Sequence, residues 1–177
     1  MLILVTGSPS SGKSLIAETI VMNIPSEKRF YIATMKNQDS ESNAKVEKHR
    51  AMRKDKNFIT IEKSTNLGDI TAEKNCVYLL ECITNLAANE MFEKDGAGYD
   101  CADKVSEDIM RLADSGATVV AVTNEVSQDG FVYDDFTNKY IENITKINAK
   151  TAMAADVVIE SVAGIPVYLK GERYEFI

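Results

Sequence analysis

A glycine-containing segment near the N-terminus carries the most specific chemical signal in the sequence. Residues 7–14 read GSPSSGKS and fit the pattern G-x-x-x-x-G-K-[ST] at every fixed position. Glycines let a short stretch of chain wrap round an anion with its N–H groups pointing inward, and a helix that begins there adds the positive end of its dipole. We therefore expect a phosphate-binding loop made by Gly7, Ser8, Pro9, Ser10, Ser11, Gly12, Lys13 and Ser14.

Two side chains at the end of this loop have predicted chemical roles. The Lys13 ammonium is expected to reach the β- and γ-phosphates of a nucleotide, and the Ser14 hydroxyl is expected to be a ligand of Mg²⁺. A magnesium site of this kind needs a second acid, usually at the end of a neighbouring strand. Glu81 directly follows the apolar run at 77–80 and is the candidate, bound to Mg²⁺ directly or through water. Glu125 follows the run at 118–122 in the same manner, and a role in the site and an ordinary loop carboxylate stay equally open for it.

A basic segment with the only histidine is the second chemical signal. Six of the 20 lysines and arginines fall between residues 45 and 56, around His49. On a helix, Lys45, His49 and Arg53 share one face because they are four residues apart. A neutral imidazole there could attack a phosphorus atom while the cations hold the phosphate oxygens. From the spacing alone, a solvated basic helix with an incidental histidine is the favoured interpretation.

The loop must be positioned by a strand before it and a helix after it, and the sequence predicts both. Residues 2–5 (LILV) form a continuous apolar run, typical of a strand buried on both faces. After the loop, apolar residues recur at the spacing of a helix: Leu15, Ile16, Ile20 and Val21. Pro25 lies just beyond the expected end of this helix. This strand–loop–helix context argues against a chance match to the motif.

Strand and helix patterns alternate over nearly the whole chain. Strands are expected at 29–33, 58–61, 77–80 and 118–122, and a closing hairpin at 157–162 and 166–169. Helices are expected at 40–54, 86–92, 105–113 and 140–152. The order predicts one α/β domain over residues 1–177, with a mainly parallel sheet, helices on both faces and a C-terminal antiparallel hairpin.

Composition excludes several classes of protein. With 177 residues and a net charge of −7, the chain is a poor candidate for a general nucleic-acid binder, whose affinity comes from neutralising phosphates. No run approaches the roughly 20 apolar residues that span a bilayer. We therefore expect a cytoplasmic protein with neither a nucleic-acid partner nor a membrane span.

Several further motifs, in order along the chain, resemble one known family. They are LILVTGSPSSGKS at 2–14, YIAT at 31–34, KVEKHR at 45–50, LLECIT at 79–84 and VTNEV at 122–126. Together they are similar to the bifunctional adenosylcobinamide kinase/adenosylcobinamide-phosphate guanylyltransferases of cobalamin biosynthesis. The resemblance spans almost the full length and implies a RecA-like P-loop three-layer sandwich that assembles as a homotrimer.

The resemblance also implies two reactions. The first phosphorylates the aminopropanol hydroxyl of adenosylcobinamide from a nucleoside triphosphate, ATP or GTP. In the second, a histidine attacks the α-phosphorus of GTP, releases pyrophosphate and passes GMP to the corrinoid phosphate. His49 matches the family histidine, which reverses the interpretation from spacing alone. Nucleotide-binding roles are implied as well for Thr34, Arg50, Arg53 and Glu81.

Two departures from the family pattern bear on the kinase half of this activity. A Gly-rich loop usual after VTNEV is replaced by SQDGFVY at 127–133, and the stretch 136–149 contains no arginine. The departures leave open a divergent member with one activity, or one that acts on another corrinoid intermediate. Apart from the departures, two alternative functions stay open. One is a P-loop small-molecule kinase without a covalent intermediate, and the other is a non-catalytic nucleotide-dependent switch.

Overall fold

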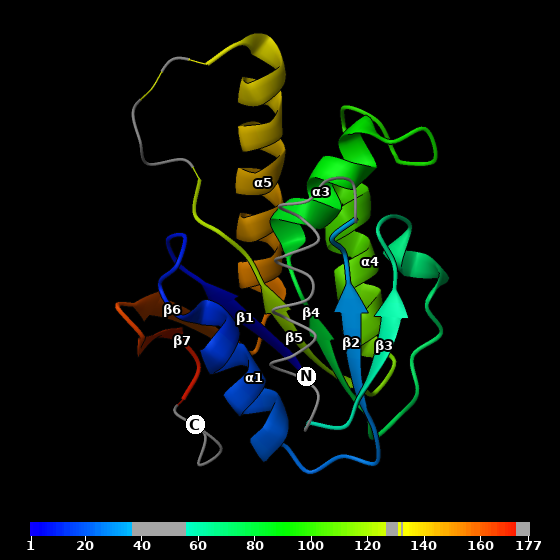
Figure 1. The fold of residues 1–177 in the computed structure, drawn as a ribbon, viewed down its shortest axis with the longest axis vertical. Helices are drawn as coiled ribbons and strands as arrows, with labels where there is room; N and C mark the ends of the chain where they lie inside the picture. The colour runs from blue at the N-terminus through cyan, green and yellow to red at the C-terminus, as the bar shows by residue number, and fades with distance from the viewer. Residues whose placement is uncertain (37–55, 127–130, 132, 173–177) are drawn as a thin grey trace.

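A seven-stranded sheet forms the centre of the molecule in a computed structural model that describes residues 1–36, 56–126, 131 and 133–172. The strand order is β3-β2-β4-β5-β1-β6-β7 (Figure 1). Neighbouring strands run parallel except β6 and β7, which form an antiparallel hairpin. The strands are β1 (Leu2–Thr6), β2 (Arg29–Ala33), β3 (Phe58–Glu62), β4 (Val77–Leu80), β5 (Thr118–Val122), β6 (Val157–Val162) and β7 (Ile165–Lys170).

Helices cover the two faces of the sheet, which confirms the predicted three-layer α/β architecture (Figure 1). Alternate residues of the central strands point to opposite faces, so that Leu2 and Leu4 join one core cluster and Ile3 and Val5 the other. The first cluster packs against α3, α4 and α5, and the second against α1. The helices are α1 (Lys13–Asn23), α3 (Ile83–Phe92), α4 (Ala102–Asp114) and α5 (Asp135–Ala154), with a short 3₁₀ helix, η1 (Leu67–Asp69).

The face that α1 buries differs from the prediction at one residue. Ile16, Ile20 and Val21 are buried as expected, but Leu15 is 60% exposed. Successive helical residues differ by about 100° in direction, and the buried stripe follows Ile16 and Ala17 in the first full turn and Ile20 and Val21 in the next. Leu15 therefore lies on the solvent side. The predicted helix at 40–54 lies outside the described residues.

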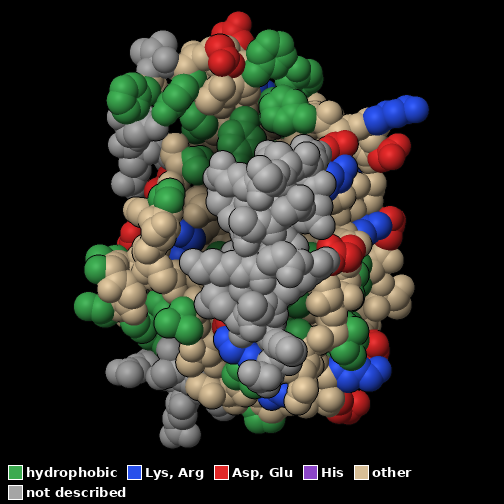
Figure 2. Space-filling view, in the orientation of Figure 1, with side chains coloured by type: hydrophobic (Ala, Val, Ile, Leu, Met, Phe, Trp, Pro, Cys, Tyr) green, Lys and Arg blue, Asp and Glu red, His purple; other side chains and the backbone are tan. Residues whose placement is uncertain are grey.

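Surface charge is mixed on the face seen in Figure 2, where lysine and arginine side chains alternate with aspartate and glutamate. Hydrophobic side chains gather at the upper end of this view. Exposed aromatic residues among those described include Phe92, Tyr99 and Phe136. No helix in the described part of the chain is long and apolar enough to cross a membrane.

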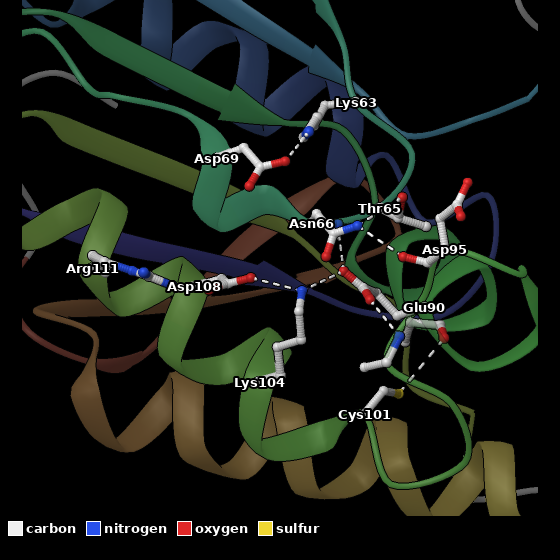
Figure 3. Close-up of polar contacts among 12 residues, drawn as sticks. Lys63, Thr65, Asn66, Asp69, Glu90, Asp95, Cys101, Lys104, Asp108 and Arg111 are labelled. Carbon is white, nitrogen blue, oxygen red and sulfur yellow. Dashed lines mark hydrogen bonds and ion pairs between the residues drawn. The ribbon is translucent and has the colours of Figure 1, made fainter.

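A buried ionic cluster ties α3 and α4 to the segment that contains η1 (Figure 3). The Glu90 carboxylate is fully buried and accepts from the Asn66 N–H at 2.5 Å, the Ala97 N–H at 2.9 Å and Lys104 Nζ at 2.8 Å. Lys104 Nζ also donates to Asp108 Oδ2 at 3.0 Å. The cluster thus fixes two loops at the carboxyl end of the sheet to the helices behind it.

Replacing Glu90 by alanine is expected to destabilise the fold by about 3 kcal/mol. The change leaves the Asn66 and Ala97 N–H groups without their acceptor and removes the buried partner of the half-buried Lys104 ammonium. Urea denaturation followed by circular dichroism measures the free energy of unfolding. Glu142→Ala is the matched control, since Glu142 pairs with lysines on the solvent side of α5 and should have little effect. Equal stability of the two variants would contradict this role for Glu90.

Candidate nucleotide site

Residues 7–12 of the predicted phosphate-binding loop form the turn between β1 and α1, and two of its glycines have positive φ angles. Gly7 and Gly12 have φ angles of 143° and 94°. Gly12 is also the N-cap residue of α1 and offers no side chain to the N–H groups of the first helical turn. These N–H groups are therefore positioned to bind an anion.

Lys13 is folded against this loop. Its side chain is only 7% exposed, and its Nζ donates to the Ser8 carbonyl oxygen at 2.6 Å. Burial lowers the pKa of the Lys13 ammonium from its usual value. An incoming phosphate would compensate this burial, because its oxygens would accept from the charged amine.

The C-terminal hairpin of β6 and β7 supports the phosphate-binding loop through hydrogen bonds. Ser161 Oγ and the Gly164 N–H both donate to the Ser11 carbonyl oxygen, at 2.6 and 2.8 Å. A Cβ atom at Gly7 would lie 2.7 Å from the Ser161 carbonyl oxygen. The supporting role of Ser161 could not be predicted from the sequence, because 150 residues separate it from Ser11. Only knowledge that β6 pairs with β1 could have indicated it.

Replacing Gly7 by alanine is expected to weaken nucleotide binding by about tenfold or more. The new Cβ would collide with backbone atoms of Ser161 in β6, and alanine would have to adopt the unfavourable positive φ of Gly7. Backbone strain of this kind costs about 1–3 kcal/mol. Calorimetric titration with a non-hydrolysable nucleoside triphosphate measures the dissociation constant. Gly98→Ala is a useful control because that glycine also has a positive φ but no atom close to the added Cβ. Unchanged affinity in Gly7→Ala would contradict the assigned loop geometry.

The predicted metal ligands lie together next to the loop. Ser14, Glu18 and Glu81 line one small cavity, with Tyr31, Leu79 and Val122 as its other walls. A hydroxyl and two carboxylates are oxygen ligands of the kind that Mg²⁺ prefers. The donor set therefore fits the expected ion. Glu18 lies one helical turn after Ser14 and therefore on the same side of α1, but the sequence alone does not place that side next to Glu81.

Two residues outside the cavity hold these carboxylates. The Thr34 N–H donates to Glu81 Oε2 at 3.2 Å, and the Thr34 hydroxyl donates to the Cys82 carbonyl oxygen. Thr34 is fully buried and supports Glu81 through its N–H. Its predicted contact with nucleotide stays a prediction. Glu18 is buried and forms an ion pair with Lys56.

A polar network fixes the segment that follows β5. Thr123 Oγ1 donates to Asn148 Oδ1 at 2.7 Å, and Asn148 Nδ2 donates back to the Asn124 carbonyl oxygen. Asn124 Nδ2 donates to Thr84 Oγ1 at 2.9 Å, and the Glu125 N–H donates to the Gly7 carbonyl oxygen at 3.2 Å. The segment is thereby fastened to α5, to the start of α3 and to the phosphate-binding loop.

The predicted histidine site lies outside the described residues. His49, Arg50 and Arg53 all fall in the segment 37–55. Of the six residues in the basic group, only Lys56 is described, and its contact with Glu18 lies beside the Ser14–Glu81 cavity. The role of His49 therefore stays a prediction.

Comparison with known proteins gives a match over almost the entire chain. Residues 3–169 match the family model described as "Cobinamide kinase / cobinamide phosphate guanyltransferase". The bifunctional adenosylcobalamin biosynthesis protein CobU of Escherichia coli is 34% identical over 185 residues, covering 96% of this chain and 100% of that protein. CobU of Salmonella typhimurium is 35% identical with the same coverage.

Solved structures with much lower identity have the same fold. The flagellar accessory protein FlaH from Methanocaldococcus jannaschii aligns with a TM-score of 0.50 at 15% identity, over 97% of this chain and 78% of that one. A DnaB-like replicative helicase aligns with a TM-score of 0.51 at 12% identity, over 90% of this chain and 47% of that one. At such identities the likeness concerns the fold alone.

Proposed function

Because the chain belongs to the cobinamide kinase/cobinamide phosphate guanyltransferase family, we propose that it carries out both reactions of that family. In the first, it phosphorylates the aminopropanol hydroxyl of adenosylcobinamide. In the second, it transfers GMP from GTP to adenosylcobinamide phosphate and gives adenosylcobinamide-GDP. The observation that supports this most strongly is the nucleotide loop, with Lys13 inside it and Ser14 and Glu81 on one adjoining cavity.

The kinase step depends on positioning and charge. The loop N–H groups and Lys13 hold the β- and γ-phosphates of ATP or GTP and stabilise the charge that develops as the γ-phosphoryl group leaves. Ser14 and Glu81 are the residues that would hold Mg²⁺, which neutralises phosphate charge when bound. Thr34 keeps the Glu81 carboxylate in place through its N–H.

The guanylyl transfer step proceeds in this proposal through a covalent histidine. Neutral His49 attacks the α-phosphorus of GTP, a P–N bond forms, and the bond to the leaving pyrophosphate breaks. Arg50 and Arg53 hold the phosphate oxygens. The corrinoid phosphate then attacks the same phosphorus and releases the imidazole. We further propose that the active enzyme assembles as a homotrimer, as the resemblance to the family implies, and that it acts in the cytoplasm.

A two-stage assay tests the proposed activity. The protein is incubated with adenosylcobinamide, Mg²⁺ and ATP or GTP. The corrinoid products are then separated and identified by their masses in mass spectrometry. The proposal predicts adenosylcobinamide phosphate first and adenosylcobinamide-GDP with pyrophosphate when GTP is present. A protein that hydrolyses nucleotide but leaves the corrinoid unchanged would instead favour a nucleotide-dependent switch. Phosphorylation without GMP transfer would leave a small-molecule kinase.

A further inference from the structure

A second, larger cavity opens beside the phosphate-binding loop. Its volume is about 540 Å³, which is in the range of small-molecule sites. One wall comes from the loop and the segment after β5, and the other from α5 and the residues just before it. Its lining includes Pro9, Glu125, Val126, Tyr133, Tyr140 and Ile141.

The position of this cavity points to the phosphoryl acceptor. Lys13, which reaches the β- and γ-phosphates in loops of this kind, donates to the Ser8 carbonyl oxygen. The Ser8–Pro9 side of the loop is thus next to the terminal phosphate, and Pro9 lines the cavity. An acceptor bound there would present its hydroxyl to the phosphoryl group that is transferred.

The lining of the cavity suits a bulky organic acceptor better than a second phosphate chain. Most of the lining side chains are apolar or aromatic, and no lysine or arginine is among those described. Tyr140 donates its hydroxyl to the Thr84 carbonyl oxygen, and burial raises the pKa of Tyr140 to about 12, so it stays a neutral wall residue. The part of a corrinoid that carries the acceptor hydroxyl fits this lining.

Glu125 is the acidic residue in the described lining of the cavity. Its backbone is held on the N-terminal side: its N–H donates to the Gly7 carbonyl oxygen, and the preceding Asn124 is held by Thr84 and Asn148. Glu125 therefore contacts the phosphate-binding loop through its backbone N–H and also lines the cavity. A carboxylate in this place can take the proton of an acceptor hydroxyl.

We propose that this cavity binds the corrinoid acceptor and that Glu125 is the general base of the kinase step, an inference that rests on the proposed function. The acceptor oxygen forms a bond with the γ-phosphorus, its proton passes to the Glu125 carboxylate, and the bond from the γ-phosphorus to the bridging oxygen breaks. The products are the corrinoid phosphate and a nucleoside diphosphate. The Glu125 proton then leaves to solvent.

Glu125→Gln tests the role of the base. The change keeps the size of the side chain and removes its basicity, and kcat for corrinoid phosphorylation should fall by about 10²-fold. KM for the corrinoid should stay close to the wild-type value, because the amide preserves the shape of the cavity lining. Glu107→Gln, on the exposed side of α4, is the matched control and should behave as wild type. A kcat at the wild-type level, a loss that appears in KM alone, or a defect that added Mg²⁺ corrects would overturn the role of Glu125.

Ile141→Lys tests the cavity itself. Titration of cobinamide into protein with a non-hydrolysable nucleoside triphosphate should show corrinoid affinity reduced by tenfold or more, about the cost of placing a charge in an apolar site. Nucleotide affinity, measured in parallel, should stay the same and reports that the variant is folded. Equal corrinoid affinity in wild type and variant would overturn the cavity. Corrinoid binding that depends on the cavity, without any phosphoryl transfer by wild type, would support the cavity but overturn both the kinase assignment and the base.

Discussion

Lys13→Ala is expected to lower kcat/KM for corrinoid phosphorylation by about 10²–10³-fold, the usual loss for one positioned group that stabilises transition-state charge. Lys13 lies inside the phosphate-binding loop, 93% shielded from solvent, and its Nζ already contacts the Ser8 carbonyl oxygen. In a nucleotide complex the same ammonium would meet the β- and γ-phosphates. Alanine leaves the backbone of the loop in place but removes this charge.

Initial rates of adenosylcobinamide phosphate formation measure the effect of Lys13→Ala. Lys28→Ala is the control. Lys28 lies just before β2, outside the loop, and forms an exposed ion pair with Glu73. Circular dichroism of both variants checks that they are folded. Phosphorylation by Lys13→Ala at the wild-type rate would contradict the assignment of the loop to catalysis.

His49→Ala is expected to abolish GMP transfer, with a loss of about 10⁴-fold or more, because it removes the nucleophile of a covalent pathway. Wild-type protein incubated with Mg²⁺ and GTP labelled at the α-phosphate should retain the label after denaturation. The bond should be acid-labile and base-stable, as a phosphoramidate is. His49→Ala should carry no such label.

Kinase activity separates this loss from unfolding. The proposed kinase step uses the loop and the Ser14–Glu81 cavity and does not use the imidazole, so His49→Ala should still form adenosylcobinamide phosphate. His49→Asn, which keeps a hydrogen-bonding side chain of similar width, should lose the label to the same extent. Labelling of His49→Ala at the wild-type level would remove His49 from the mechanism.

The local features of the fold could be predicted from the sequence because their causes are local. Each predicted strand among the described residues is present within one or two residues of the expected bounds. Continuous apolar runs such as 2–5 identify strands that are buried on both faces, and the glycines of the loop identify the turn into α1. The same logic located Glu81, since the end of a parallel strand also places its following residue at the carboxyl edge of the sheet.

Features that depend on contacts between distant segments could not be predicted. Ser161 supports Ser11 only because β6 pairs with β1, and that pairing is a property of the whole sheet. Glu18 lines the same cavity as Glu81 because α1 packs over β4, which the helical pattern of α1 cannot reveal. Leu15 has an apolar side chain yet faces solvent, since helical spacing allows more than one stripe and packing selects between them.

A crystal structure of the protein with Mg²⁺ and a non-hydrolysable GTP analogue would show directly where the triphosphate binds. We expect phosphate oxygens within hydrogen-bond distance of the N–H groups of residues 8–14 and of Lys13 Nζ. We also expect a metal ion bound to Ser14 Oγ and held by Glu81, directly or through a water molecule. A triphosphate bound elsewhere, or a metal ion distant from both side chains, would contradict the assignment of this loop to nucleotide binding.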